Sequence, residues 1–479
     1  MHWFRIMYKW AVAIPFVTVL PLIMGCNKLL DAGTPDGKVV TSEVYKSDSL
    51  AQAAVIGIYF KMMESFGPFN GYMSRYPGLS CDDLAAGNTV VATDQPFLSN
   101  TLPSSNKEVR YIWANTYLYI YQCNDLIEGL TGKNSITPAL HDQLLGEAYF
   151  LRAFSYFYLV NLYGEVPLVL STDYTKSANM PRTAVTDVYN QIVDDLQNAQ
   201  NLLKVAYVTT PEFPNARVRV NRLAVRALQA RIYLYLGQWA NAAAAASEVI
   251  QSGVYQLETD LLQTFRYNSM ETILQFMPVL ETYNTAEGGW FVPINPNGRP
   301  ALTLSDSLLK YIEPGDKRKT NWVRTVTVSS KQYNSPFKYK LNTATPREEY
   351  NMVLRLAEQY CIRAEARAML DQLPDAVNDL NTIRKRAGLP DLTNITTQTQ
   401  AMAAVEQERR MELFAEWGHR WFDLKRWPAR SATHPNDKRI DEIMSAYRPT
   451  YWKTTAAFWP IPSDEITRNP ALVQNEGYN

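Results

Sequence analysis

Glu412 and Glu416 are the two residues whose type and spacing could most directly perform chemistry. Residues four apart lie on one face of an α-helix, so the two carboxylates would point the same way. Two such groups could serve acid–base cleavage of a glycosidic bond. A structural role is favoured instead, because possible ionic and packing partners are close in sequence: Arg409, Arg410, Arg420, Arg426, Trp417, Trp421, Phe422 and Trp427. Arg420 and Asp423, three residues apart, can pair on one helical turn.

Other catalytic and metal-binding patterns are missing from the sequence. The four histidines show no metal-ligand spacing, and there is no CxxC pair, GxSxG elbow, GxGxxG fingerprint or phosphate-binding loop. Asp82 and Asp83 are adjacent acids, for which a turn or a calcium-coordinating role fits as well as catalysis. We therefore expect no catalytic residues, no metal site and no cofactor.

Two segments have a composition suited to binding a glycan. Sugar rings pack on flat aromatic faces, while amide, carboxylate and guanidinium groups satisfy their hydroxyls. Residues 66–76 and 283–299 combine Tyr, Trp and Phe with Asn, Gly and Arg. We expect Trp290, Tyr72 and Tyr76 to be the stacking rings. The expected polar contacts are Asn295, Arg299 and Asp82. The alternative for each residue is ordinary packing within a loop.

Composition and charge narrow the class of protein. Lys+Arg and Asp+Glu both number 47, so the net charge is zero, whereas proteins that bind nucleic acid normally carry a basic excess. We therefore expect no nucleic-acid partner. With 46% hydrophobic and 20% charged residues, the chain can bury a large core. The 29 tyrosines and 11 tryptophans indicate either large core residues or a surface for ring-shaped ligands.

The N-terminal residues have the features of a targeting signal. Arg5 and Lys9 precede an apolar stretch that is too short, and too interrupted by proline, to be a good membrane-spanning helix. Residues 22–26 resemble a bacterial lipobox, which predicts a signal peptide over residues 1–25, lipidation of Cys26 and a tether over 26–40. Ordinary secretion with cleavage nearby is the alternative. Of the remaining cysteines, Cys81 and Cys123 could form a disulfide, although spacing alone does not decide it.

Hydrophobic periodicity predicts a mostly α-helical body over residues 41–479. Two helix pairs have the length of tetratricopeptide repeats, and two more are expected. The predicted pairs are 221–236 with 239–250, 350–370 with 375–386, 138–163 with 187–203, and 41–64 with 109–130. Irregular insertions are predicted at about 65–106, 254–344 and 428–479. The fold class is therefore a scaffold of about four tetratricopeptide-like helix pairs packed against a loop-rich irregular subdomain.

Several segments resemble one family, SusD/RagB. The most specific is residues 408–427, ERRMELFAEWGHRWFDLKRW, and the others are 145–153, 163–168, 363–366, 380–389, 459–466, 469–470 and 474–478. The resemblance implies a lipoprotein of the outer membrane that is anchored by its lipid and faces the cell exterior. It also implies four tetratricopeptide-like helix pairs and a SusC-like TonB-dependent barrel as partner.

The resemblance and the aromatic loops together predict a non-catalytic protein. It would bind an oligosaccharide or polysaccharide at the cell surface and deliver this glycan ligand to the SusC-like transporter. The alternative is a structural lid or interaction subunit of the transporter complex, with peptide or other non-glycan cargo. A surface glycosidase is a third, weaker alternative.

Overall fold

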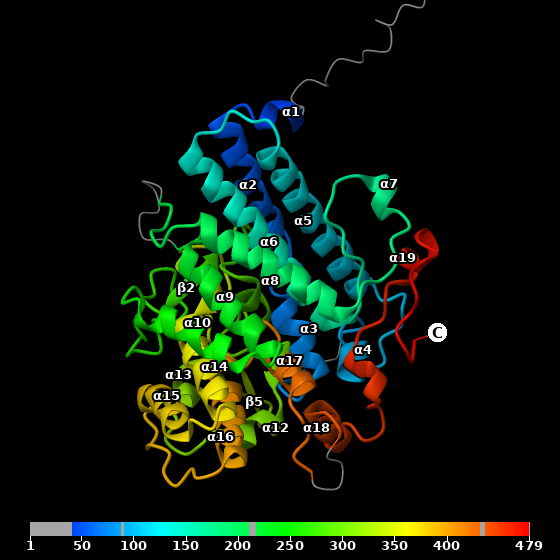
Figure 1. Ribbon diagram of the computed structural model, residues 1–479. Helices are drawn as coiled ribbons and strands as arrows, with labels where there is room; N and C mark the ends of the chain where they lie inside the picture. Colours follow the sequence, from blue (N-terminus) through cyan, green and yellow to red (C-terminus); the bar gives the residue numbers. More distant parts are fainter. Residues whose placement is uncertain (1–40, 88–90, 210–216, 432–435, 479) are drawn as a thin grey trace, which may run out of the picture.

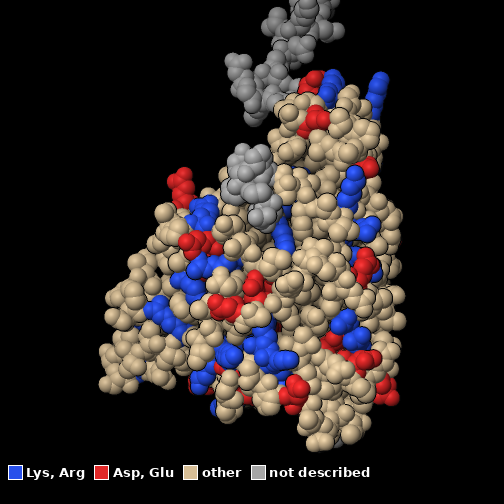
Figure 2. Space-filling view, turned by 90° about the vertical axis from the view of Figure 1, so that its left-hand side faces the viewer, with Lys and Arg blue, Asp and Glu red and all other residues tan. Residues whose placement is uncertain are grey.

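The computed structural model describes residues 41–87, 91–209, 217–431 and 436–478. The predicted signal peptide, lipidation at Cys26 and tether lie outside the described residues. The described chain is mostly helical, as predicted (Figure 1). None of its helices is both long enough and apolar enough to cross a membrane. The face in Figure 2 intermixes basic and acidic side chains, without a large area of one sign.

Four helix pairs form the scaffold, as the sequence predicts. Two pairs make the upper part of Figure 1, with α2 beside α5 and α6 beside α8. The other two, α9 with α10 and α14 with α15, continue the stack below, and α16 packs on α14 and α15. The bounds are α2 (Asp48–Met63), α5 (Lys107–Thr131), α6 (Pro138–Tyr163), α8 (Val185–Leu202), α9 (Arg222–Tyr235), α10 (Trp239–Gln251), α14 (Leu356–Met369), α15 (Leu373–Arg386) and α16 (Gln398–Leu413).

Small side chains let the lower helices approach each other closely. Ala242, Ala245 and Ala246 of α10 are fully buried against α9 and α14. Their partners include Ala230 on α9 and Ala366 on α14, so alanine meets alanine at the contact. Helices α10 and α14 therefore pack directly, although about a hundred residues of chain separate them in sequence. The long insertion between them leaves the helical stack continuous.

Helix α6 is the centre of the hydrophobic core. From Leu144 to its end at Tyr163 nearly every residue is buried. A helix that is apolar on all sides must be enclosed by other elements, and here α5, α8 and α2 surround it. Its buried charges are paired: Glu147 lies 2.6 Å from Arg219, and Arg152 lies 2.6 Å from Asp195. These ion pairs join α6 to the neighbouring chain segments.

The three insertions are less irregular than predicted, because short helices and strands form within them. The first contains α3 (Tyr72–Ser80), β1 (Leu84–Ala86) and α4 (Gln95–Leu98). The second contains β2 (Thr272–Phe276), α11 (Ala286–Phe291), β3 (Leu302–Leu304), α12 (Asp306–Lys310), α13 (Lys317–Trp322), β4 (Val323–Val328) and β5 (Lys331–Pro336). The third contains α18 (Arg439–Tyr447), a 3-10 turn (Thr454–Ala457) and α19 (Ser463–Arg468).

The remaining elements are α1 (Thr41–Val44), α7 (Tyr174–Ser177), β6 (Asn351–Arg355) and α17 (His419–Arg426). The strands form three antiparallel two-stranded sheets, which pair β1 with β3, β2 with β6 and β4 with β5. The register Leu84↔Leu304 joins the first insertion to the second. Residues more than 200 positions apart in sequence are thereby brought side by side. Cys81, Cys123 and Cys361 are buried free thiols, so no Cys81–Cys123 disulfide forms.

Candidate functional site

Five half-buried aromatic rings gather where the first insertion meets the second, and we call them the ring cluster: Phe66, Tyr72, Tyr111, Tyr283 and Trp290. Tyr72 and Trp290 are nearly parallel, with centroids 5.8 Å apart and an interplanar angle of 25°. Phe66 lies 4.8 Å from Trp290 and 5.3 Å from Tyr283. Tyr111 of α5 completes the cluster, 5.9 Å from Tyr72. Each ring keeps part of its surface open to solvent.

Helix α3 positions Tyr72 at its first residue. The helix begins after Gly71, which has a φ of +93° that L side chains rarely adopt. A Cβ at Gly71 would lie 2.5 Å from the ring of Trp290 and 2.6 Å from Ala286. Glycine is therefore needed here both for the turn and for the close approach of α3 to α11. The approach allows Tyr72 to stack beside Trp290.

Helix α11 positions Trp290 and is joined to α3 by a buried hydrogen bond. Thr285 caps α11, because its hydroxyl accepts from the Gly288 N–H at 3.0 Å. Glu287 is 2% exposed and accepts from the Ser74 hydroxyl at 2.8 Å. Burial raises the pKa of Glu287 to about 7. The two short helices that carry the rings are thus held together by contacts at their bases.

Polar groups border the rings. The Arg75 guanidinium lies 4.7 Å from the centroid of Trp290 and pairs with Asp94 at 2.8 Å. Burial raises the pKa of the Tyr72 hydroxyl, and the carboxylate of Glu108 raises it further, so Tyr72 stays a neutral donor. The site therefore offers aromatic faces with a guanidinium, a phenol and a carboxylate at their edges. Such a set suits a ligand with apolar faces and many hydroxyls.

The structure brings together three of the six residues predicted to bind ligand. Tyr72 and Trp290 are neighbours, and Tyr76 contacts Tyr72 edge-on at 4.8 Å. Tyr76 is only 2% exposed and stacks on Phe97 at 4.3 Å, so it supports Tyr72 from beneath. It offers no open ring face to a ligand.

The other three predicted residues have different surroundings. Asn295 and Arg299 are exposed on the segment after α11. The Asn295 side chain accepts from the Asn297 N–H at 3.0 Å, and the Arg299 guanidinium lies 4.6 Å from the ring centroid of Tyr333. Asp82 is 1% exposed and pairs with Arg420 at 2.9 Å. Each of these contacts is made to a partner outside the ring cluster.

Phe66, Tyr111, Tyr283 and Arg75 were not singled out as binding residues. Three of them lie in the aromatic segments that the sequence does identify. Tyr111 lies on α5, and its spacing in the sequence predicts only that it belongs to that helix. Only the tertiary fold brings this residue of the helical scaffold next to the insertions that carry the other rings.

Glu412 and Glu416 are held in a buried network of charges, as the structural interpretation requires. They are 0% and 6% exposed, and Arg355 contacts Glu412 at 2.5 Å and Glu416 at 2.8 Å. Arg318 adds a second contact to Glu412 at 3.1 Å, and Lys338 pairs with Glu416. Burial alone would raise the pKa of Glu412, but the surrounding arginines hold it well below its usual range. Both carboxylates are enclosed away from solvent and from any substrate, and removing one of their cationic partners would leave a buried charge uncompensated.

The possible pairing of Arg420 with Asp423 does not form. Arg420 pairs with Asp82 at 2.9 Å and with Glu406 at 2.9 Å, while Asp423 pairs with Arg409 at 2.8 Å. The reason is tertiary: α17 packs against α3, which brings the acids of the first insertion to Arg420.

The same packing accounts for Asp82 and Asp83. Arg410 lies 2.8 Å from Asp82 and 3.1 Å from Asp83, so both carboxylates already have buried counter-ions. With Cys81 they are the three residues of the described chain close enough together to hold a metal ion. The neighbouring guanidiniums make the spot unfavourable for a cation.

Comparison with known proteins gives concordant matches over nearly the whole chain. The family model described as "SusD family" matches residues 241–478, and the model "Starch-binding associating with outer membrane" matches residues 61–234. SusD-like protein P38 of Formosa agariphila is 22% identical over 526 residues, covering 98% of this chain and 99% of the relative. A SusD-like protein of Bacteroides ovatus is 23% identical, covering 88% of this chain and 83% of the relative.

Solved structures share the fold. A SusD superfamily protein from Bacteroides vulgatus superposes with a TM-score of 0.75 at 19% identity, covering 91% of this chain and 100% of that one. A structure described as "Laminarin binding SusD-like protein" has a TM-score of 0.73 at 23% identity, with coverages of 91% and 100%. At these identities the structural likeness establishes the arrangement of the helices and not the ligand.

Proposed function

The chain belongs to the SusD/RagB family, and from this premise we propose that it binds an oligosaccharide at the ring cluster without cleaving it. The ring cluster is the observation that carries the proposal. The starch-binding description of one matching family model and the laminarin-binding solved relative support a glycan as the ligand class.

The geometry suits recognition of a sugar. Tyr72 and Trp290 lie nearly parallel with their centroids 5.8 Å apart, and both residues keep part of their surface exposed to solvent. The rings have few rotatable bonds and are held from below, so little entropy is lost when a ligand orders them. Arg75 and the Tyr72 hydroxyl can satisfy sugar hydroxyls at the edges of the rings.

The state of the buried acids supports binding without cleavage. The acids of the family-like segment, Glu412 and Glu416, are buried and paired with arginine and lysine. Near the rings, Glu287 is buried against Ser74. Hydrolysis needs two carboxyl groups that flank a bound glycosidic bond. These three carboxylates do not meet that requirement.

A glycan panel followed by calorimetric titration of the best ligand tests this proposal. We expect saturable binding, and a loss of about ten- to a hundred-fold in affinity when Trp290→Ala or Tyr72→Ala removes about 1.5–3 kcal/mol of ring contact. Tyr174→Ala is the matched control, since Tyr174 is 77% exposed on α7 and has no ring partner among the described residues. A reducing-end assay on the same ligand should show no product. Equal affinity in all three variants, or released sugar, would refute the proposal.

The proposal extends to location and partner. Lipidation at Cys26 would anchor the protein in the outer membrane, facing the exterior, where it would deliver glycan to a SusC-like TonB-dependent transporter. The description "associating with outer membrane" of a matching family model supports the location. Affinity purification of the lipidated protein from its own membrane should recover a barrel protein of this class. If the barrel co-purifies but no glycan binds, the protein is a structural lid with peptide or other cargo.

A further inference from the structure

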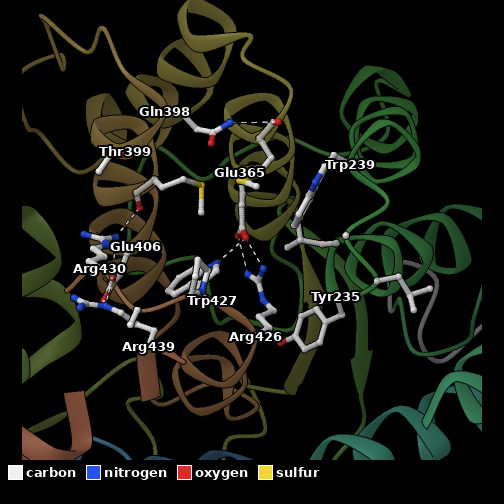
Figure 3. Close-up of a pocket in the computed structure, with 17 residues that line it drawn as sticks. Tyr235, Trp239, Glu365, Gln398, Thr399, Glu406, Arg426, Trp427, Arg430 and Arg439 are labelled. Carbon is white, nitrogen blue, oxygen red and sulfur yellow. Dashed lines mark hydrogen bonds and ion pairs between the residues drawn. The ribbon is translucent and has the colours of Figure 1, made fainter. Parts of the chain in front are cut away.

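A cavity of about 550 Å³ lies among the lower helices, apart from the ring cluster (Figure 3). It is lined by the end of α9, the start of α10, helices α14 and α16, residues 426–430 and the first residue of α18, Arg439. Its volume falls within the range of about 300–1,000 Å³ that is usual for small-molecule sites. None of its lining residues belongs to the ring cluster. The cavity is therefore a feature separate from the ring cluster.

One side of the cavity is aromatic and apolar. Trp239, the first residue of α10, stands half-buried on that side (Figure 3). Met369 and Met402 continue the apolar lining. Trp427 is held at the base, because its indole N–H donates to Glu365 at 2.7 Å. The ring of Trp239 offers the kind of flat face on which a sugar ring packs.

The opposite side is a cluster of guanidiniums around one carboxylate (Figure 3). Glu406 is contacted by Arg420 at 2.9 Å, by Arg430 at 2.6 Å and by Arg439 at 3.1 Å. Arg420 also pairs with Asp82, and Arg439 also pairs with Glu442 at 2.6 Å. Because Arg430 shares Glu406 with two other arginines, this carboxylate compensates its positive charge only in part.

The neighbouring acids show which arginine is least compensated. Of the three arginines that line the cavity, Arg426 pairs with Asp423 at 2.7 Å and Arg439 with Glu442 at 2.6 Å, whereas the ion pair of Arg430 among the described residues is with the shared Glu406. Burial lowers the pKa of Arg430 below its usual range; Arg439 and Arg420 add to the lowering, while Glu406 and Glu442 oppose it. A negative group beside Arg430 would relieve this repulsion. With its side chain 32% exposed, Arg430 remains within reach of a ligand from solvent.

We propose that this cavity is a second binding site, which takes a saccharide unit bearing a carboxylate or sulfate group. Its ligand class rests on the proposed function, while the site and the charge preference are additional to it. The sugar ring packs on Trp239, and the acidic group points across the cavity to Arg430. A purely apolar side chain of a peptide would match Trp239 and the methionines but would offer no acceptor to the guanidinium of Arg430. A neutral sugar could accept a hydrogen bond from Arg430 but would add no negative charge beside it.

Calorimetry with size-matched oligosaccharides tests the proposal, using an oligogalacturonate, a sulfated galactan fragment and a neutral gluco-oligosaccharide. We expect one or both anionic ligands to bind the unmodified protein, and to bind more weakly as salt rises. Trp239→Ala and Arg430→Gln should each weaken that binding at least ten-fold. Lys385→Gln, which removes an exposed positive charge from α15, should leave it unchanged. Thermal melting would verify that each variant is folded, and Arg430→Gln is the safer one because Arg430 lies at the surface.

Trp290→Ala separates this proposal from the first one. If both sites exist, Trp290→Ala loses binding at the ring cluster and keeps the anionic ligand, while Trp239→Ala does the reverse. Loss of the anionic ligand in Trp290→Ala alone would assign all binding to the ring cluster and overturn the second site. No binding of either anionic ligand at millimolar concentration, or undiminished binding in Arg430→Gln, would overturn it as well, even where the ring cluster binds a neutral glycan.

Discussion

Replacing Glu287 by glutamine should make the protein more stable at alkaline pH. The carboxyl group is 2% exposed at the base of α11, where Ser74 donates to it at 2.8 Å and the Asn351 amide lies 3.5 Å away. It forms no ion pair with any of the described residues. Burial is the main reason that its pKa rises from an ordinary 4.5 to about 7, and Glu416 contributes further. Above pH 7 the native state therefore encloses a charge without a counter-ion.

The sign and size of the effect follow from proton linkage. Between pH 4.5 and 7 the native state keeps a proton on Glu287 that the unfolded state has released, so stability falls as pH rises. Each pH unit between the two pKa values is worth about 1.4 kcal/mol, which amounts to about 3 kcal/mol over the whole interval. Below pH 4.5 both states are protonated and the favourable contribution is complete. The amide introduced by Glu287→Gln stays neutral throughout and retains an oxygen that accepts from Ser74.

Urea denaturation at pH 5, 6, 7 and 8 measures this prediction. The free energy of unfolding of Glu287→Gln should exceed that of the unmodified protein by less than about 1 kcal/mol at pH 5 and by about 3 kcal/mol at pH 8. Glu147→Gln is the matched control: it removes the partner of a buried arginine, Arg219, and should cost about 3–5 kcal/mol. A difference between Glu287→Gln and the unmodified protein that is constant with pH, or a less stable variant at pH 8, would show the reasoning to be wrong.

Three further outcomes are expected. Arg355→Met removes the cation shared by three buried glutamates and should lower the free energy of unfolding by about 3–5 kcal/mol in urea titrations. A loss below about 1 kcal/mol would contradict a stabilising role for this network of charges. Gly71→Ala should lower the melting temperature and weaken glycan binding about ten-fold, because its Cβ would lie 2.5 Å from Trp290. Gly57→Ala on α2 is its control, since nothing lies within 4 Å of that Cβ, and it should be neutral or stabilising. Cys26→Ser should move the protein from the membrane fraction to the soluble fraction, as judged by immunoblotting. An unchanged distribution would contradict the predicted lipid anchor.

Long periodic segments made the scaffold predictable. The predicted helix over residues 138–163 coincides with α6, and the predicted turn at Gly237 separates α9 from α10. Short elements were missed where local signals oppose them. Helix α3 contains Pro77 and Gly78, which favour a loop, and it persists because α17, α4 and β1 pack against it. Tertiary contacts therefore override propensity in the insertions.

The candidate site was predictable in its ring types but not in its geometry. An aromatic residue in a polar, glycine-rich segment is a reasonable candidate for ligand contact, and Tyr72 and Trp290 do lie together. Asp82 could not be assigned from its neighbours in sequence, because its partners Arg410 and Arg420 lie more than 300 residues away. The cavity beside Trp239 was missed for the same reason, since it is formed by five separate segments.

The pairing of Asp82 and Asp83 with Arg410 and Arg420 has a consequence for how the protein is made. A polypeptide emerges from the ribosome or an export channel N-terminus first, so the two aspartates arrive long before their counter-ions. Until residue 420 has emerged, these acids cannot be enclosed without a large cost in free energy. The segment that carries Tyr72 therefore cannot complete its folding until nearly the whole chain has emerged. Prematurely terminated products would lack a settled binding surface and would stay open to proteolysis.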